Sequence, residues 1–303
     1  MFGFLNVNKP AGITSRDVVN QIQRLVRPNK VGHVGTLDPL ATGVLVVCIG
    51  PATRLASYVQ SQTKSYIGNF RLGLVSDTED IEGNVEPLPN APSISQSQIL
   101  DVLPGFVGQI QQLPPRYSAL KLNGKRAYQL ARKGHEFTLQ PRTIQIHNVQ
   151  LTRFDFPDFE IEVQCGSGTY IRSIGRDIGK KLGSNAVMTD LQRTGIGSFQ
   201  LDNAMEFNTI NLDSISANLD NPATHLLNLN SVQLTDREVD ELSHGKFWTG
   251  SNEVSDNELI AVDGKHNLIC ILKKVDHGKF RPGINFSGYW RSRGQNPRND
   301  TSK

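Results

Sequence analysis

The chain has 303 residues, of which 37% are hydrophobic and 20% are charged, with 27 Gly and 15 Pro spread along it. This length allows one large domain, alone or with a small companion, and the composition excludes collagen, coiled coil and extensive disorder. The 32 basic and 29 acidic residues give a net charge of +3, which does not by itself indicate a nucleic-acid partner, so the distribution of charge has to decide.

The cysteines and the first residues of the chain indicate a compartment. Cys48, Cys165 and Cys270 lie far apart, without the paired spacing of a zinc site or a disulfide framework. Pro10 and Gly12 interrupt the first segment before an apolar stretch could form a signal peptide or a membrane helix. We therefore expect a cytoplasmic protein with reduced cysteines and no membrane contact.

The first predicted elements are a strand, a helix and a second strand. Residues 4–7 are apolar and predict a strand, and the helical spacing of apolar residues that follows begins at a cap, Thr14 or Ser15, and ends at Pro28. The continuously apolar segment 44–49 is typical of a strand that is buried on both faces.

The middle of the chain mixes strands and helices. An acidic loop spans residues 75–94, and a helix that begins at Thr169 is closed by Gly183. The elements predicted here are strands at 65–74, 143–154 and 158–165 and helices at 96–103 and 169–182. Because strands and helices do not alternate strictly, we expect an α+β fold built on a mixed, largely antiparallel sheet.

The composition changes at residues 205–231, where Asn, Asp, Ser and Pro accumulate, and this predicts a domain boundary. The prediction is a large domain over 1–228, a small β-rich unit over 229–286 and a mobile basic tail over 287–303. The small unit is predicted to hold a helix at 238–244 and strands at 258–262 and 267–275.

The loop at residues 31–45 holds Asp38 between three glycines, Gly32, Gly35 and Gly43, and leads directly into an apolar strand. Such a loop holds the carboxylate in a defined place, as a functional site requires. From the spacing alone, an aspartate that only forms a turn explains the segment equally well. The segment matches neither phosphate-binding glycine pattern.

Arg172 and Arg176 lie four residues apart in the helix predicted from Thr169, so they share a face. An arginine in the first turn opposes the helix dipole, which indicates a compensating contact with a buried carboxylate or a phosphate. A solvated arginine is the alternative.

Positive charge is concentrated at residues 116–142. This segment has seven basic residues and one acidic residue, a net charge of +6 that leaves −3 for the rest of the chain, and its aromatic residues are Tyr117, Tyr128 and Phe137. Interleaved charge and aromatic rings are typical of RNA binding, and the lack of counter-charges disfavours a merely solvated helix face. If the segment is such a face, RNA would instead follow Arg176, Arg193 or the C-terminal unit.

The sequence disfavours two other kinds of site, an acyl-transfer site and a metal site. Residues 118–121 match SxxK and residues 255–257 match SDN, as in penicillin-binding enzymes, but KTG is missing. The seven histidines show no metal-ligand spacing, so we expect no metal.

Five motifs occur in order: NKPAGITS at 8–15, GHVGTLDPLATGVL at 32–45, KSY at 64–66, PPRYSALKLNGKRAY at 114–128 and GTYIRSIGRDIG at 168–179. Together they resemble the TruB family of tRNA pseudouridine synthases. The resemblance implies a pseudouridine-synthase catalytic domain that converts uridine 55 in the T-loop of tRNA without a cofactor, and a PUA-like RNA-binding module over 229–286. A noncatalytic RNA-binding or tRNA-folding protein with the same cleft is the alternative.

The resemblance also implies roles for individual residues. Asp38 would be the catalytic aspartate and Arg172 its ion-pair partner, Tyr66 would stack on the flipped uracil and assist proton transfer, Leu191 would wall the pocket and His33 would help to displace the target nucleotide. Lys9 and Pro10 would support the cleft from behind, and Arg54, where many relatives carry Lys, would help to bind the substrate. From their charge, we expect Lys125, Arg126, Arg132 and Lys133 to meet the RNA backbone. No exposed heptad indicates assembly, so we expect a monomer.

Overall fold

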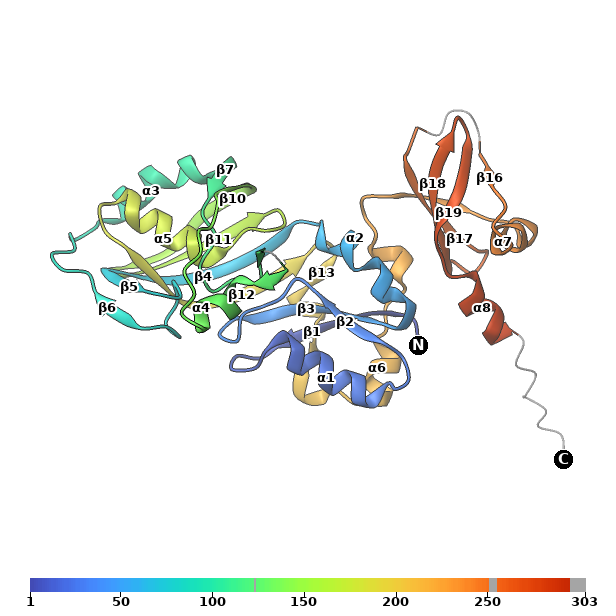
Figure 1. The fold of residues 1–303 in the computed structure, drawn as a ribbon, viewed down its shortest axis with the longest axis horizontal. Helices are drawn as coiled ribbons and strands as arrows, with labels where there is room; N and C mark the ends of the chain where they lie inside the picture. Colours follow the sequence, from blue (N-terminus) through green and yellow to red (C-terminus); the bar gives the residue numbers. More distant parts are fainter. Residues whose placement is uncertain (123, 251–254, 295–303) are drawn as a thin grey trace.

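The computed structural model describes residues 1–122, 124–250 and 255–294. A large domain contains one continuous sheet, and a smaller β module lies at the C-terminal end of an elongated molecule (Figure 1). No helix in these ranges is long and apolar enough to span a lipid bilayer.

The large sheet has the strand order β14-β1-β3-β12-β4-β11-β10-β7, with β2 paired to β3 and β13 paired to β12. Its strands are β1 (Gly3–Lys9), β2 (Val31–Val34), β3 (Thr42–Ile49), β4 (Lys64–Leu72), β7 (Gly108–Gln112), β10 (Arg142–Asp155), β11 (Asp158–Cys165), β12 (Ala186–Ile196), β13 (Phe199–Gln200) and β14 (Met205–Glu206). Among the described strand pairs of this large sheet, only β1–β14 and β3–β12 are parallel, which confirms the mixed, largely antiparallel sheet.

Helices and short 3₁₀ turns pack on this sheet or connect its strands. The helices are α1 (Ser15–Leu25), α2 (Ala56–Gln60), α3 (Gln96–Val102), α5 (Ile171–Lys181) and α6 (Leu212–Ala217). The 3₁₀ turns are η1 (Gly50–Leu55), η2 (Leu103–Phe106), η3 (Leu201–Asn203), η4 (Phe207–Thr209) and η5 (Pro222–His225). The basic segment at residues 116–142 leaves the large sheet, and we call it the basic excursion. It contains the hairpin of β8 (Lys121–Leu122) and β9 (Lys125–Arg126) and the short helix α4 (Ala127–Arg132).

Strand β3 is buried on both faces, as its apolar run predicts. Leu45 and Val47 face the cluster that includes Val18 of α1, whereas Val44 and Val46 face the cluster on the other side of the sheet. Alternate side chains of a strand point to opposite faces, so one apolar strand serves two cores. Helix α1 covers the first face and α2 the second (Figure 1).

Helix α1 forms where the sequence predicts it. Thr14 is the N-cap, and it forms a capping box with Asp17 in which each side chain bonds the other residue's backbone N–H. Val18 and Ile22 are buried on its inner face. The helix ends at Leu25, ahead of the predicted terminator.

Two predictions about local structure are wrong. Thr169 does not cap α5: its hydroxyl donates to the carbonyl of Gly166 at 3.2 Å, and the helix begins at Ile171. The segment predicted as an acidic loop contains a hairpin, β5 (Leu74–Ser76) and β6 (Val85–Pro87). Both errors concern short-range turn geometry, which apolar periodicity does not encode.

The C-terminal module is a five-stranded sheet with two helices. Its elements are β15 (Asn230–Gln233), α7 (Asp236–Ser243), β16 (Trp248–Thr249), β17 (Glu258–Val262), β18 (Leu268–Asp276), β19 (Lys279–Asn285) and α8 (Ser287–Gly294). The predicted helix and strand pair are therefore present. The predicted mobile tail is wrong over residues 287–294, because α8 packs Tyr289 and Trp290 against Phe2 of the large domain. Residues 295–303 of that tail lie outside the described residues.

The segment predicted as a boundary is joined to the large domain. Phe4 of β1 and Asp220 exchange two backbone hydrogen bonds of 3.1 and 2.8 Å, and β14 pairs with β1.

Cys48, Cys165 and Cys270 are all buried and free.

Candidate active site

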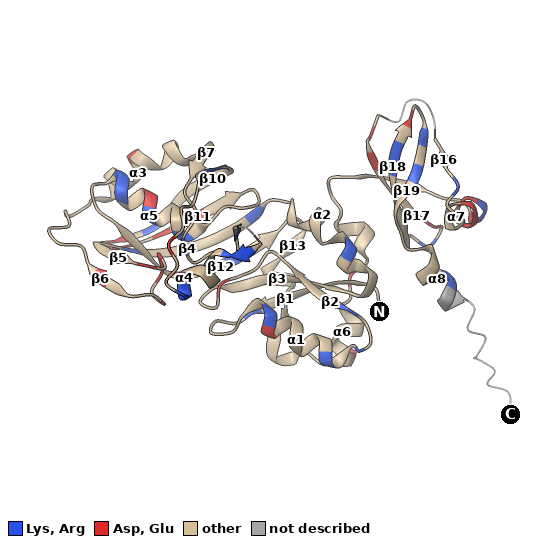
Figure 2. Ribbon diagram, viewed as in Figure 1, with Lys and Arg blue, Asp and Glu red and all other residues tan. Residues whose placement is uncertain are grey.

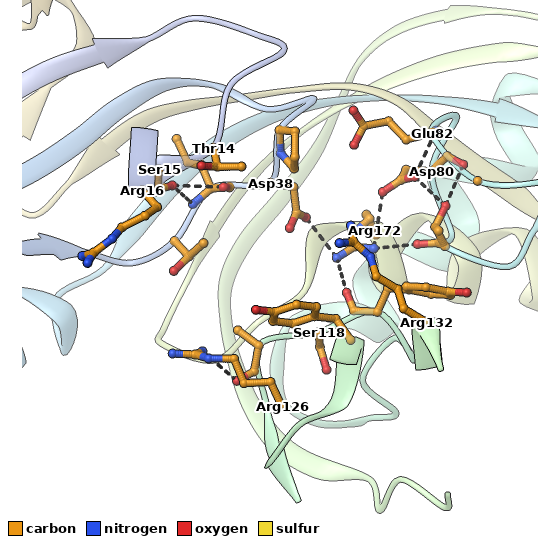
Figure 3. A pocket seen from close by; sticks show the side chains of 18 of the residues that line it. Thr14, Ser15, Arg16, Asp38, Asp80, Glu82, Ser118, Arg126, Arg132 and Arg172 are labelled. Carbon is orange, nitrogen blue, oxygen red and sulfur yellow. Dashed lines mark hydrogen bonds and ion pairs between the residues drawn. The ribbon is translucent and has the colours of Figure 1, made fainter. Parts of the chain in front are cut away.

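A cavity of about 850 Å³ opens beside the large sheet. Five segments line it: the N-terminal end of α1, the β2–β3 loop, the loop at residues 77–84, the basic excursion and α5 (Figure 3). One wall is acidic, with Asp77, Asp80 and Glu82, and the other side carries arginines, among them Arg126 and Arg132. The cavity is therefore electrically polarised.

Asp38 lies at the turn between β2 and β3, and buried groups fix the backbone on both sides of it. The hydroxyl of Ser15 donates to the carbonyl of Leu37 at 3.0 Å and accepts from the Leu37 N–H at 2.8 Å. On the other side, the ammonium of Lys9 donates to the carbonyl of Pro39 at 3.2 Å. The Asp38 side chain remains 39% exposed, so it is held in place and still faces the cavity.

Arg172, in the first turn of α5, forms an ion pair with Asp38. Its Nη2 lies 3.0 Å from Asp38 Oδ2 and also donates to the carbonyl of Tyr117 at 3.0 Å. Its Nη1 lies 3.3 Å from Asp80 Oδ2 and donates to the carbonyl of Thr78 at 2.6 Å. The side chain is only 5% exposed, so the predicted carboxylate contact is confirmed and the solvated alternative is wrong.

Asp80 is a site residue that sequence reasoning missed. Its side chain is 4% exposed, and burial raises its pKa while the hydroxyl of Thr78 and the charge of Arg172 act in the opposite direction. In the sequence it is one of several acidic residues in a single loop, and nothing in their spacing marks the one that turns inward.

His33 of β2 also lines the cavity, as expected from the resemblance. Its Nε2 lies 3.1 Å from Thr36 Oγ1. Burial lowers its pKa, and the nearby charges of Arg193, Arg16 and Arg126 lower it further. The ring is therefore neutral at pH 7, able both to donate and to accept a hydrogen bond.

Tyr66 and Leu191 are not among the described residues that line the cavity. Both are buried, at 8% and 6% exposure. Burial raises the pKa of Tyr66, and the charge of Arg193 opposes this. Tyr66 of β4 pairs in register with Arg193 of β12, and its ring belongs to the buried core cluster of the large domain.

Arg193 is a second residue that sequence reasoning did not place in the site. It is 1% exposed, and it donates to the carbonyl of Val44 at 2.7 Å and to that of Gly35 at 2.8 Å. It therefore ties β12 to both ends of the loop that carries Asp38. Since Arg176 is also buried, the alternative RNA path over Arg176 and Arg193 is wrong.

Neither Lys9 nor Pro10 is among the described residues that line the cavity. The Lys9 ammonium also donates to the carbonyls of Pro10 and Ile13, at 2.8 Å each, and burial lowers its pKa to about 8. It joins the turn after β1 to the turn that carries Asp38.

Arg54 lies elsewhere. Its guanidinium donates to the carbonyl of Asn285 at 2.9 Å and lies over the ring of Phe286, so it joins the large domain to the C-terminal module. The expectation that Arg54 acts in the cleft is wrong, because the side chain is committed to the contact between the domains.

The basic excursion divides into two parts. Arg126 and Arg132 line the cavity, and Arg132 lies over the ring of Tyr128. Lys125 and Lys133 are exposed and do not line it. Figure 2 shows basic residues at α4, whose last residue is Arg132. No group of three or more His, Cys, Asp or Glu in the described ranges is arranged to hold a metal ion.

The fold is similar to that of chains in two solved complexes. The chain matches a chain in the structure of an H/ACA RNP bound to a substrate RNA containing 2′-deoxyuridine, with a TM-score of 0.71, 22% identity and coverage of 94% of this chain and 85% of that one. It matches a chain of a Cbf5-Nop10-Gar1 complex with a TM-score of 0.70, 23% identity and coverage of 94% and 84%. At this identity the likeness shows the fold.

Sequence comparison identifies the family. Residues 23–171 match the model of the TruB family pseudouridylate synthase N-terminal domain. The tRNA pseudouridine synthase B of Clostridium acetobutylicum is 40% identical over 260 residues, which cover 86% of this chain and 88% of the relative. That of Prochlorococcus marinus is 41% identical over 286 residues, covering 91% and 90%. The chain therefore belongs to the TruB family of pseudouridylate synthases.

Proposed function

We propose that this enzyme isomerises uridine 55 in the T-loop of tRNA to pseudouridine, with Asp38 as the catalytic carboxylate. The observation that carries the proposal is the pairing of a partly exposed carboxylate with a buried arginine, Asp38 with Arg172, at the base of the cavity. The names of the relatives support tRNA as the substrate.

The reaction needs little beyond a positioned carboxylate. The N1–C1′ bond of one uridine breaks, a C5–C1′ bond forms, C5 loses its hydrogen as a proton and N1 gains a proton, so the product is an isomer and no electron is gained or lost. The guanidinium of Arg172 stabilises the carboxylate of Asp38 and limits its rotation. A fixed carboxylate removes part of the orientational entropy that the step would otherwise require.

The target uridine has to leave its stack before Asp38 can reach it. In the proposal the base enters the cavity past His33 and reaches Tyr66 and Leu191 in the core, where the tyrosine ring provides a stacking face and its hydroxyl carries a proton. Because Tyr66 is 8% exposed, the base has to open the cavity wall to meet the ring.

The polarity of the cavity supports an orientation for the RNA. Phosphates are attracted to the basic excursion and repelled by the acidic loop at residues 77–84, so the backbone of the T-arm follows Arg126, Arg132 and the exposed lysines beside them. The C-terminal module, PUA-like in the proposal, supplies a second contact to the same tRNA. The enzyme acts as a monomer without a cofactor.

Chemical mapping tests the proposal. An unmodified tRNA transcript is incubated with the enzyme, treated with a carbodiimide that forms a stable adduct with pseudouridine, and read by primer extension. We expect one new stop, at uridine 55, and none in a transcript with cytidine at that position. A protein that only binds or folds RNA would leave both transcripts without a stop, and that result would refute the proposal.

A further inference from the structure

Helix α5 carries a second buried arginine one turn after Arg172. The side chain of Arg176 is 10% exposed, and its Nε and Nη2 donate to the carboxylate of Asp177 at 2.8 and 3.0 Å. Its Nη1 forms an ion pair with Glu79, and Nη2 also donates to the carbonyl of Leu113 at 2.9 Å. None of these contacts involves the cavity.

Glu79 occupies an unusual position in the acidic loop. Its φ is 66°, in the left-handed region that disfavours side chains other than glycine, and its side chain is 13% exposed. The carboxylate accepts from the hydroxyl of Ser173 at 2.6 Å and pairs with Arg176, so both contacts are to α5. Together with the backbone hydrogen bonds of Glu79 and Ile81 to Met188 of β12, these two contacts hold the loop in a conformation that its backbone disfavours.

The residues on either side of Glu79 bind the other arginine. The carbonyl of Thr78 accepts from Arg172 at 2.6 Å, and the carboxylate of Asp80 lies 3.3 Å from it. A second loop shows the same division, because Leu113 binds Arg176 and Tyr117 binds Arg172. Two arginines on one helix face therefore hold the same two loops, and only Arg172 reaches Asp38.

We propose that Glu79 and Arg176 are positioning residues for the reaction. The pair fixes the two loops against α5, and the loops in turn fix the plane of the Arg172 guanidinium so that its Nη2 points to Asp38. The proposal rests on the catalytic role proposed for Asp38. Neither member of the pair lines the cavity, so the pair acts on the rate of the chemical step and not on the binding of RNA.

The substitution Glu79→Gln tests this with little change in shape. The amide oxygen can still accept from Ser173, whereas the charge that pairs with Arg176 is lost. We expect kcat on a T-arm stem-loop to fall roughly tenfold, since a shift of a fraction of an ångström at the reacting groups has an effect of this order. We expect KM to stay within about twofold, because the uniform binding energy is unchanged.

A matched control is available on the same arginine. Asp177→Asn removes the other carboxylate of Arg176 but lies on α5 itself, so it leaves the loops in place and kcat should stay at the wild-type value. The double variant Glu79→Gln with Arg176→Met should lose no more kcat than the worse single variant, because each substitution removes the same ion pair between Glu79 and Arg176. If Glu79→Gln folds poorly, Glu79→Gly serves as the test instead. Glycine adopts the left-handed backbone at this position without strain, and this variant should show the same loss of kcat.

Each result decides the proposal. A wild-type kcat in Glu79→Gln or Glu79→Gly overturns it, and so does an equal loss in Asp177→Asn, an additive double variant, or a change confined to KM. An inactive wild-type enzyme would instead contradict the proposed function, so the two failures are distinguishable.

Discussion

Asp38 and Arg172 meet 3.0 Å apart across the cavity, and the two side chains differ sharply in their access to solvent, at 39% and 5% exposure. The arginine is bound by two backbone carbonyls and a second carboxylate, so its position does not depend on Asp38. Asp38 alone is free to change partners during a reaction. In the proposed function the arginine is therefore the fixed reference and the aspartate is the reacting group.

Replacing Arg172 should therefore affect folding as well as activity. Arg172→Ala leaves the buried Asp80 carboxylate without its cation, which costs roughly 3–5 kcal/mol in the free energy of unfolding. Chemical denaturation measures this loss. The control is Arg71→Ala, which breaks an exposed pair with Asp158, with side chains 49% and 46% exposed, and should cost less than about 1 kcal/mol. Similar values for the two variants would contradict the structural role of Arg172.

The expected roles of the Tyr66 ring and of its hydroxyl can be separated by substitution. Tyr66→Phe keeps the ring and so should keep the binding of RNA and the fold, but it should lose most turnover because the phenolic proton carrier is gone. Tyr66→Ala should damage both, and its buried position adds a loss of about 3–5 kcal/mol in stability. Turnover and affinity measured on a T-arm stem-loop check this, and equal behaviour of the two variants would show that the roles are not separate.

The basic excursion should control affinity and not the choice of uridine, because phosphate contacts position an RNA without reading its sequence. Replacing Lys125, Arg126, Arg132 and Lys133 with Ala should make the slope of log K against log salt shallower by about two to three units. A variant with Arg153 and Lys180 replaced, neither of which lines the cavity, is the control. An unchanged slope in the fourfold variant would place the RNA backbone elsewhere.

Lys64 gives the stability a pH dependence. Its ammonium is buried, donates to the carbonyl of Gln62 at 2.6 Å and to Ser167 Oγ at 2.9 Å, and has its pKa lowered from 10.5 to about 8 by burial. Between these values the folded protein binds fewer protons than the unfolded chain, so this group's contribution to stability rises with pH.

Lys64→Met removes that contribution. From pH 8 to 9.5, the unfolding free energy of the wild type should rise relative to that of the variant by roughly 1–2 kcal/mol. Denaturation curves of both proteins across this range measure the difference, and the other titrating groups cancel because both proteins contain them. Parallel pH profiles would contradict the buried, pKa-shifted state of Lys64.

Regular elements with long apolar patterns could be predicted from the sequence. Strand β3 and helix α1 follow directly from their periodicity and caps, because burial of apolar side chains decides both. The pairing of Arg172 with a carboxylate could also be anticipated from its place in the first turn of α5, since an uncompensated cation is unfavourable there.

The rest of the site depends on contacts between distant segments. Asp80 comes from a loop whose inward turn is set by contacts with α5 and β12, and Arg193 is buried because three strands meet around it. The family resemblance implies a cleft role for Arg54, but the docked C-terminal module binds its side chain. Such tertiary contacts leave no periodic signal in the sequence.

In the proposed reaction Asp38 drives the attachment of C1′ to C5 of uridine, and tritium release measures this attachment directly. A T-arm stem-loop with uridine labelled by tritium at C5 should lose its label to water with the wild-type enzyme, because bond formation at C5 expels that hydrogen. Asp38→Asn should release none while its affinity for the RNA falls by no more than about tenfold, since binding depends mostly on remote phosphates. Retention of tritium with the wild-type enzyme, or release by Asp38→Asn free of wild-type protein, would contradict the account.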